Sequence, residues 1–171
     1  MTRLFAALAV GAALAAPTAA SSGHVFRVAH VTDGDTIALT NGERVRLVQI
    51  DTPEVYFGTE CYGRAASRAL KRMLPSGSAV RLVVDPALDR VDRYGRLLRY
   101  VVRVRDGVDL NIALVRAGIA APYFFDGDRG RYAGLLTRLA LRARAKQLGL
   151  WGACPGTPVD FERAVDTGTA G

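Results

Sequence analysis

The stretch "HVFRVAHVTDGDTIALTNGERVRLVQI", residues 24–50, alternates segments rich in β-branched and apolar residues with two short turn signals. Asp33-Gly34 and Asn41-Gly42 are dipeptides typical of tight turns between strands. The segments that favour strands are 24–31, 36–40 and 44–50. Strands joined by such short turns pair as antiparallel neighbours. The stretch therefore predicts three consecutive strands of a small sheet.

The rest of the chain predicts two more strands and three helices. The strands are expected at 79–85 and 97–105, and the helices at 62–74, 109–118 and 131–149. Apolar residues fall on one face of the first helix at Ala66, Leu70, Met73 and Leu74, and of the last at Tyr132, Leu135, Leu136, Leu139 and Ala143. We expect one α+β domain, mainly a five-stranded antiparallel barrel.

The first 20 residues have the layout of a secretory signal peptide. Arg3 precedes an apolar run, and small residues surround position 20. A membrane anchor is the alternative, but the run stops at Pro17, short of the roughly 20 apolar residues that a spanning helix needs. We expect cleavage near Ala20, export to the periplasm or the medium, and no stable membrane association afterwards.

The charge of the chain indicates an anionic partner. Loss of Arg3 with the signal peptide lowers the formal net charge from +7 to +6. All but two of the 23 basic residues are arginines, whose planar guanidinium suits bidentate contact with phosphate. A compositional bias of the source genome would give the same excess of arginine. Charge alone therefore favours nucleic acid only modestly over other acidic partners.

Two cysteines, Cys61 and Cys154, lie far apart in the sequence. In an exported protein we expect them to form a disulfide, while a metal site is disfavoured because only His24 and His30 could join them. A bridge across so long a loop stabilises a fold by roughly 4 to 5 kcal/mol in the chain-entropy description. Its role would be structural.

Carboxylates gather at the ends of the first predicted strands. Asp33 and Asp35 flank Gly34, and "DTPE" at 51–54 follows the third strand. Each motif alone is read more simply as a turn, and Asp-Gly-Asp recurs at 126–128 without such neighbours. Together they form an oxygen-only set that suits Ca²⁺ or Mg²⁺.

Two arginines complete a pattern that suits phosphodiester hydrolysis. Arg46 lies in the third strand, and Arg96 closes "DRYGR" at 92–96, which could also be a hairpin turn around Gly95. A cation and two guanidinium groups can neutralise the charge that grows on phosphoryl oxygens. A spare carboxylate can orient or deprotonate the attacking water.

"DGDT", "RLVQIDTPE", "DRYGR", "LVRAGIA" and "LWG" resemble, in order and spacing, the staphylococcal nuclease (thermonuclease) family over roughly residues 25–152. The resemblance implies an OB-fold barrel with three helices and a Ca²⁺ site formed by Asp35, Asp51 and Thr52. Arg46 and Arg96 match its phosphate-binding arginines, and Glu54 its general base. Asp33 is better placed as a turn residue, or as a residue behind the ligands, than as a direct ligand.

The resemblance also implies where the substrate lies. Arg93 and Tyr94 match residues that contact a terminal phosphate, and Tyr123 matches a tyrosine that packs near a base; each could equally be a packing residue. The segment 54–62 is shorter than the family's mobile loop and holds Cys61. A Cys61–Cys154 bridge would tie the end of this segment to the C-terminal helix.

The sequence thus predicts a signal peptide (1–20), a nuclease OB-fold domain (21–156) and a flexible C-terminal tail (157–171). The expected activity is that of a monomeric, Ca²⁺-dependent endonuclease that cleaves DNA and RNA with low sequence specificity and leaves 3′-phosphate ends. The alternatives are a catalytically inactive OB-fold that binds nucleic acid and a metal-free basic surface protein. Neither requires the acidic cluster.

Overall fold

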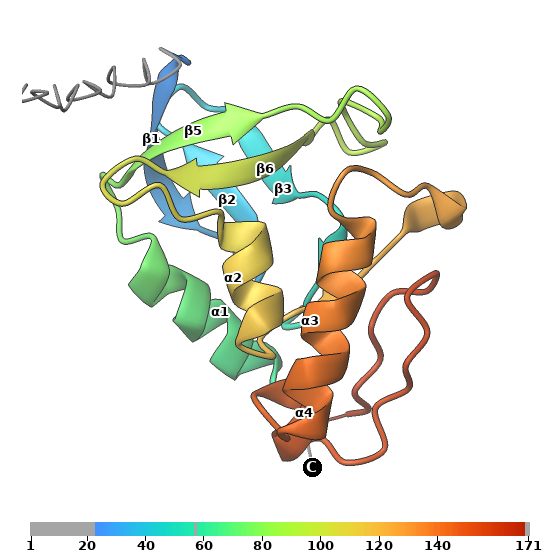
Figure 1. Ribbon diagram of the computed structural model, residues 1–171. Helices are drawn as coiled ribbons and strands as arrows, with labels where there is room; N and C mark the ends of the chain where they lie inside the picture. Colours follow the sequence, from blue (N-terminus) through green and yellow to red (C-terminus); the bar gives the residue numbers. More distant parts are fainter. Residues whose placement is uncertain (1–22, 57, 170–171) are drawn as a thin grey trace, which may run out of the picture.

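The computed structural model describes residues 23–56 and 58–169. A closed barrel with the strand order β1-β2-β3-β6-β5 forms one half of the molecule (Figure 1). Its strands are β1 (Val25–Val31), β2 (Thr36–Leu39), β3 (Arg44–Leu47), β5 (Ala79–Val83) and β6 (Leu97–Arg103). The predicted five-stranded α+β barrel is confirmed.

One pairing in the barrel is parallel, which corrects the expected antiparallel barrel. Strand β3 runs parallel to β6, with Arg46 opposite Leu98, while the other pairs are antiparallel. The reason is geometric, because alternating directions cannot continue around a closed ring of five strands. The parallel seam brings β3 beside the start of β6, close to the 92–96 turn.

The expected third strand is interrupted. It stops at Leu47, Gln49 takes a left-handed backbone conformation (φ 61°), and the chain resumes as β4 (Ile50–Asp51). Strand β4 leaves the barrel and pairs with β7 (Ala121–Pro122). This break carries Asp51 away from the barrel wall and toward the turn between β1 and β2.

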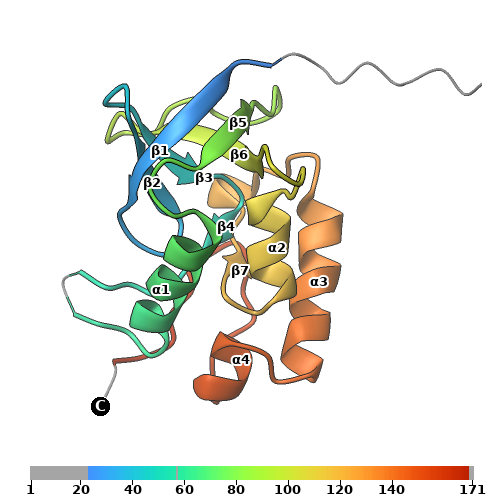
Figure 2. The same ribbon diagram turned by 90° about the vertical axis from the view of Figure 1, so that its left-hand side faces the viewer.

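Helices cover one side of the barrel (Figure 2). They are α1 (Gly63–Met73), α2 (Leu110–Arg116), α3 (Ala133–Ala145) and the short α4 (Leu150–Ala153), with a 3₁₀ turn η1 at Phe125–Gly127. The predicted helix faces are largely buried at Ala66, Leu70, Leu74, Leu136, Leu139 and Ala143. All of these side chains except Ala66 join the barrel interior in one hydrophobic core.

The predicted disulfide between Cys61 and Cys154 is present, with the two Cα atoms 6.0 Å apart. It links the start of α1 to the end of α4. The predicted signal peptide lies outside the described residues. Within 23–56 and 58–169, no helix is long and apolar enough to cross a membrane.

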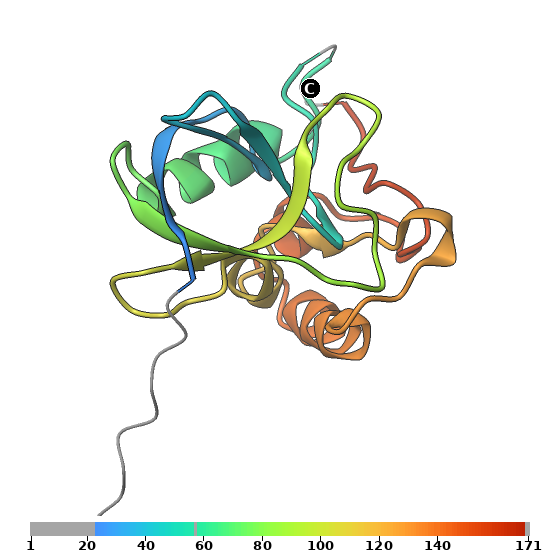
Figure 3. The same cartoon turned by 90° about the horizontal axis from the view of Figure 1, so that it is seen from above.

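The C-terminal segment, for which the composition predicts a flexible tail, packs against the rest of the molecule. Residues 157–169, which we call the strap, run back along the molecule toward the loop before α1 (Figures 2 and 3). The Phe161 carbonyl accepts a hydrogen bond from Phe124, and the side chain of Val165 is buried in the core. The apolar side chains of Phe161 and Val165 pack on the core from an otherwise polar segment that lacks periodicity.

Candidate active site

The predicted metal and catalytic residues line one hollow of about 180 Å³, which we call the acidic cavity. It lies beside the parallel seam, where β4 and the turns before β2 and β6 meet. The residues that line it are Asp33, Asp35, Arg46, Asp51, Thr52, Pro53, Glu54, Val55 and Arg96. Four carboxyl groups thus face two guanidinium groups.

The turn between β1 and β2 delivers Asp35 into the cavity. The Asp33 carboxylate accepts a hydrogen bond from the backbone N–H of Asp35 (3.1 Å), which closes the turn. Gly34 is required here for space, because a Cβ atom would collide with the side chain of Thr52. Asp33 is therefore a turn residue, while the Asp35 side chain faces Thr52.

Arg46 holds the two candidate metal-binding carboxylates together. Its Nε lies 3.0 Å from Asp35 Oδ1, and its Nη2 lies 2.6 Å from Asp51 Oδ1. Its Nη1 donates to the carbonyl oxygens of Leu47 and Ile50 at 2.7 and 2.6 Å, on either side of the strand break. The break between β3 and β4 thus fixes the guanidinium against both carboxylates.

Thr52 binds the remaining oxygen of Asp35. Its backbone N–H and its hydroxyl both donate to Asp35 Oδ2 at 3.0 Å. On the other side, the Thr36 hydroxyl donates to Asp35 Oδ1, and Arg96 Nη1 lies 3.4 Å from that hydroxyl. Asp35 is only 6% exposed, so these bonds replace most of its contact with water.

Several carboxyl groups in the cavity have raised pKa values. Burial, with a smaller contribution from Asp35, raises the pKa of Asp51 to about 7 despite its contact with Arg46. Burial and the charge of Asp35 raise the pKa of Asp33 to about 6. The pKa of Glu54 is also raised, by desolvation and by the charges of Asp35 and Glu60. The cavity holds more negative charge than its two arginines balance.

The donor atoms suit a hard divalent cation. Among the residues that the structure describes, no three acidic, histidine or cysteine side chains gather as a complete ligand set. Asp35 and Asp51 offer carboxylate oxygens, and Thr52 adds a backbone carbonyl. Ca²⁺ takes about six to eight oxygen ligands and accepts water among them, so a partial protein set is sufficient. A cation there would offset the negative charge of the four carboxyl groups, which the two arginines balance only in part.

Arg96 is held at the cavity by Asp92, a residue that the sequence analysis did not select. Arg96 Nε lies 2.6 Å from Asp92 Oδ2, and Asp92 Oδ1 accepts from the backbone N–H groups of Tyr94 and Arg96. Burial opposes ionisation, but these hydrogen bonds keep the pKa of Asp92 below its usual value. The i,i+4 spacing of Asp92 and Arg96 in a glycine turn was the available signal.

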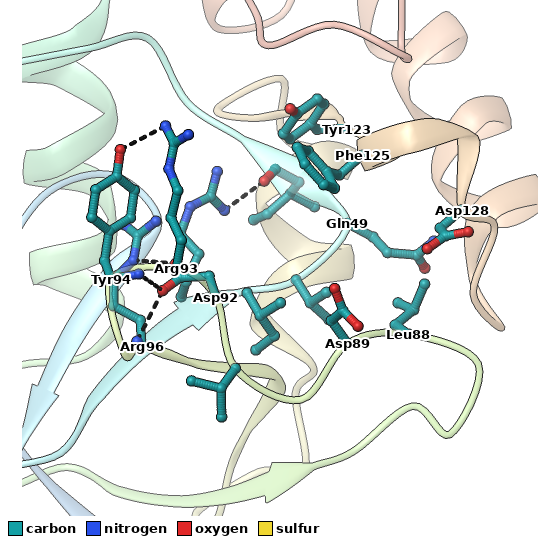
Figure 4. Close-up of a pocket in the computed structure, with 15 residues that line it drawn as sticks. Gln49, Leu88, Asp89, Asp92, Arg93, Tyr94, Arg96, Tyr123, Phe125 and Asp128 are labelled. Carbon is teal, nitrogen blue, oxygen red and sulfur yellow. Dashed lines mark hydrogen bonds and ion pairs between the residues drawn. The ribbon is translucent and has the colours of Figure 1, made fainter.

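A second hollow of about 430 Å³ adjoins the first, and Arg46 and Arg96 line both. We call it the aromatic pocket. Figure 4 shows Arg93, Tyr94 and Arg96 on one side of it and Tyr123 with Phe125 across from them. Arg93 and Arg96 lie over the Tyr94 ring at 4.8 and 5.3 Å from its centroid. The three predicted substrate-binding residues therefore share this pocket.

Comparison with known proteins identifies the family. Residues 44–153 match the family described as staphylococcal nuclease homologue. The chain is 36% identical over 135 residues to the thermonuclease of Staphylococcus intermedius, covering 75% of this chain and 77% of that protein. The chain belongs to the staphylococcal nuclease family.

Other relatives of this nuclease carry endonuclease names. An uncharacterized endonuclease of Escherichia coli O157:H7 is 36% identical over 128 residues, which is 73% of this chain and 75% of the relative. The SPbeta prophage-derived endonuclease YokF of Bacillus subtilis (strain 168) is 34% identical over 125 residues, 70% of this chain but 41% of that protein. The enzyme class of the chain is that of a phosphodiester-hydrolysing nuclease.

Some parts of this nuclease were not found from its sequence. Phe125 stands edge-to-face with Tyr123, with ring centroids 6.2 Å apart, and extends the aromatic pocket. Beside the pocket, the Tyr100 hydroxyl contacts Gln49 Oε1 at 2.6 Å and Asp85 Oδ2 at 3.0 Å. The second Asp-Gly-Asp begins in η1 and ends at the residue after it, outside the acidic cavity, as expected for a loop.

Proposed function

We propose that this nuclease is a Ca²⁺-dependent endonuclease that cleaves DNA and RNA with low sequence specificity and leaves 3′-phosphate ends. The observation that carries the proposal is the meeting of two hollows at Arg46 and Arg96. One is acidic and suits a cation, and the other is aromatic and suits a nucleotide. A phosphodiester placed between them would contact both arginines.

Asp35 and Asp51, with the Thr52 carbonyl, would hold the Ca²⁺ ion. When bound, the ion supplies positive charge that stabilises the phosphoryl oxygens. Arg46 is kept in place by its bonds to Asp35, Asp51 and two carbonyl oxygens, and Arg96 by Asp92. Both guanidinium groups are therefore oriented before substrate arrives, as electrostatic stabilisation of a transition state requires.

Glu54 is the group that would accept a proton from water. It lines the acidic cavity, and its backbone N–H and carbonyl are both hydrogen-bonded to Glu60. Its raised pKa makes it a better base than an ordinary carboxylate at neutral pH. In the proposed step, water attacks phosphorus and gives its proton to Glu54. The bond between phosphorus and the 5′-oxygen breaks, that oxygen takes up a proton from solvent water, and the phosphate stays on the 3′ side.

The aromatic pocket supports low sequence specificity. Stacking on an aromatic ring tolerates any base, because every base presents a π-face. Tyr123 and Phe125 offer such rings, and Arg93 with Tyr94 offers a site for a terminal phosphate. Aromatic stacking and phosphate contacts do not depend on the sugar, which supports action on both DNA and RNA.

We also propose that the nuclease is exported as a monomer. The predicted signal peptide supports export, and the Cys61–Cys154 disulfide is the bond expected of a protein in an oxidising compartment.

The test uses residues 21–171 with denatured DNA and with RNA, each in Ca²⁺ and in chelator. The unchanged protein should cleave both polymers in Ca²⁺ only, and its products should need phosphatase treatment before a polymerase extends them. Glu54→Gln and Arg96→Ala should lose at least about a hundredfold in rate. Asp126→Asn, in the second Asp-Gly-Asp, is the matched control and should keep full activity. Binding without cleavage in Ca²⁺ would instead indicate the inactive OB-fold alternative.

A further inference from the structure

The strap contacts a carboxylate of the acidic cavity, that of Asp51. The backbone N–H of Val165 donates to Asp51 Oδ2 at 2.9 Å, a contact between residues 114 positions apart in the sequence. The other oxygen of the same carboxylate, Oδ1, contacts Arg46 at 2.6 Å. Asp51 is 9% exposed, so the strap supplies one of the few partners available to it.

The strap also pairs with the loop that follows Glu54. The backbone N–H of Cys61 donates to the Gly168 carbonyl at 2.8 Å, and the Thr167 hydroxyl donates to the Cys61 carbonyl at 2.7 Å. Glu60 and Thr169 form an antiparallel bridge. Figures 2 and 3 both place the end of the strap against this loop.

Glu60 connects this pairing to the proposed base. Its carboxylate accepts from the Glu54 N–H at 3.2 Å, and its own N–H donates to the Glu54 carbonyl at 2.9 Å. The Thr167 hydroxyl lies 3.5 Å from the same Glu60 carboxylate. The strap therefore touches Asp51 directly and the backbone of Glu54 through one intervening residue.

The strap is anchored at both ends of this path. The Cys61–Cys154 disulfide holds its beginning next to the loop, and the Thr157 hydroxyl donates to the Cys154 carbonyl at 2.7 Å. In between, Phe161 packs on the core and Val165 is buried. These contacts hold the strap on the N-terminal side of the Val165 N–H, and the pairing with the loop holds it on the C-terminal side.

We propose that the strap is a positioning element of the nuclease site, with Val165 as the residue that orients Asp51. Its N–H holds Asp51 Oδ2, so that Oδ1 faces Arg46 and the cavity. Groups that orient a metal ligand typically change metal affinity by about 10- to 100-fold when they are removed. This inference rests on the proposed Ca²⁺ site and adds to it a part of the chain that no catalytic motif contains.

The test compares Val165→Pro with Val165→Ala, measured by calorimetric Ca²⁺ titration. Both variants lose the buried isopropyl group, but only the proline also loses the N–H. Val159→Pro is the control for proline in the strap, because the Val159 N–H has no hydrogen-bond partner among the described residues. We expect Val165→Pro to bind Ca²⁺ about tenfold more weakly than Val165→Ala, and Val159→Pro to bind like the unchanged protein.

Activity supplies a second readout. The Ca²⁺ concentration for half-maximal rate should rise about tenfold in Val165→Pro, while the rate at saturating Ca²⁺ recovers most of its value. A purely structural role would lower the rate at every Ca²⁺ concentration equally. Equal Ca²⁺ affinity in Val165→Pro and Val165→Ala, or tighter binding in the proline variant, would overturn the proposal.

A deletion of residues 162–171 keeps the experiment decisive if the proline variant does not fold. It retains Phe161 and the disulfide, and it should weaken Ca²⁺ binding at least as much as Val165→Pro does. Unchanged Ca²⁺ affinity in the folded deletion variant would overturn the proposed role of the strap and leave the proposed Ca²⁺ site in place. Absence of Ca²⁺ binding in the unchanged protein would overturn the proposed Ca²⁺ dependence and this inference with it.

Discussion

The acidic cavity and the aromatic pocket share Arg46 and Arg96 but are built in opposite ways. In the acidic cavity Asp35 and Asp51 are buried and bonded to their neighbours, and Asp35 is contacted by Arg46, Thr36 and Thr52. In the aromatic pocket Tyr94 is 57% exposed and Phe125 is 60% exposed. The first region is a network, and the second is a set of nearly independent surfaces.

This contrast matches the two tasks that the proposed function assigns. Charge stabilisation needs groups whose positions are fixed before substrate binds, since reorganisation would raise the barrier. Binding of any sequence needs surfaces that tolerate different bases. We therefore expect substitutions in the acidic cavity to affect several properties at once, and substitutions in the aromatic pocket to affect substrate binding alone.

The largest effect is expected from Arg46→Ala. The change removes a phosphate-binding guanidinium and leaves Asp35 and Asp51 without their common partner. Activity should fall by about a thousandfold. In Ca²⁺-free buffer the free energy of unfolding should also fall by about 3 kcal/mol, because breaking a buried ion pair leaves its partners uncompensated. Activity assays and urea denaturation measure the two effects.

Arg93→Ala is the matched control in the aromatic pocket. It removes a guanidinium that contacts the exposed Tyr94 ring and hydroxyl. We expect a higher KM with unchanged stability. Equal losses of stability in the two variants would contradict the distinction between a network and independent surfaces.

The second prediction concerns pH in the absence of Ca²⁺. The pKa of Asp51 rises from an ordinary 3.8 to about 7 in the folded state, so between these values the folded protein binds more protons than the unfolded chain. The contribution of Asp51 to stability is therefore fully present below about pH 4 and is lost as pH rises toward 7. Each pKa unit of this difference corresponds to about 1.4 kcal/mol.

Asp51→Asn isolates this contribution. From pH 5 to pH 8, in chelator, the free energy of unfolding should decline more in the unchanged protein than in Asp51→Asn. Added Ca²⁺ should stabilise the unchanged protein more at pH 8 than at pH 5. Identical slopes in the two proteins would show that burial of Asp51 has no energetic consequence.

The residues of the acidic cavity were easier to predict from the sequence than the residues that hold them in place. Asp35 and Asp51 lie at strand ends, and Arg46 lies within β3. Turn signals and strand periodicity in the sequence predict these approximate places. That they belong to one site was implied by the resemblance of the motifs, in their order, to the staphylococcal nuclease family. Asp92 was missed because a carboxylate in a glycine turn is explained by the turn alone.

Three structural features could not be predicted from local sequence patterns. Val165 contacts Asp51 across 114 residues, from a segment whose composition predicts a flexible tail. The parallel pairing of β3 with β6 follows only once the barrel is known to close with five strands. At the strand break, Gln49 takes a left-handed backbone conformation although it is not glycine. The sequence carries no signal for such a conformation.

A third, smaller effect is expected from the double variant Tyr123→Ala/Phe125→Ala. It removes both rings opposite Tyr94, and stacking on one ring contributes about 1–3 kcal/mol per base. KM for denatured DNA should rise about tenfold, with kcat and stability nearly unchanged. A large fall in kcat would mean that these rings also orient the phosphodiester, and the two regions would then be coupled.

The smallest effect is expected from Tyr94→Phe. The Tyr94 hydroxyl accepts a hydrogen bond from Arg93 at 2.7 Å, while its ring contacts Arg93 and Arg96. The variant keeps the ring and loses one exposed hydrogen bond, so KM should rise only about threefold. Because Arg93 and Tyr94 are proposed to bind a terminal phosphate, the rise should appear with 5′-phosphorylated oligonucleotides and vanish with dephosphorylated ones. An equal rise in KM with both substrates would show that the Tyr94 hydroxyl positions Arg93 and does not bind the phosphate. The aromatic pocket would then contain a small network of its own.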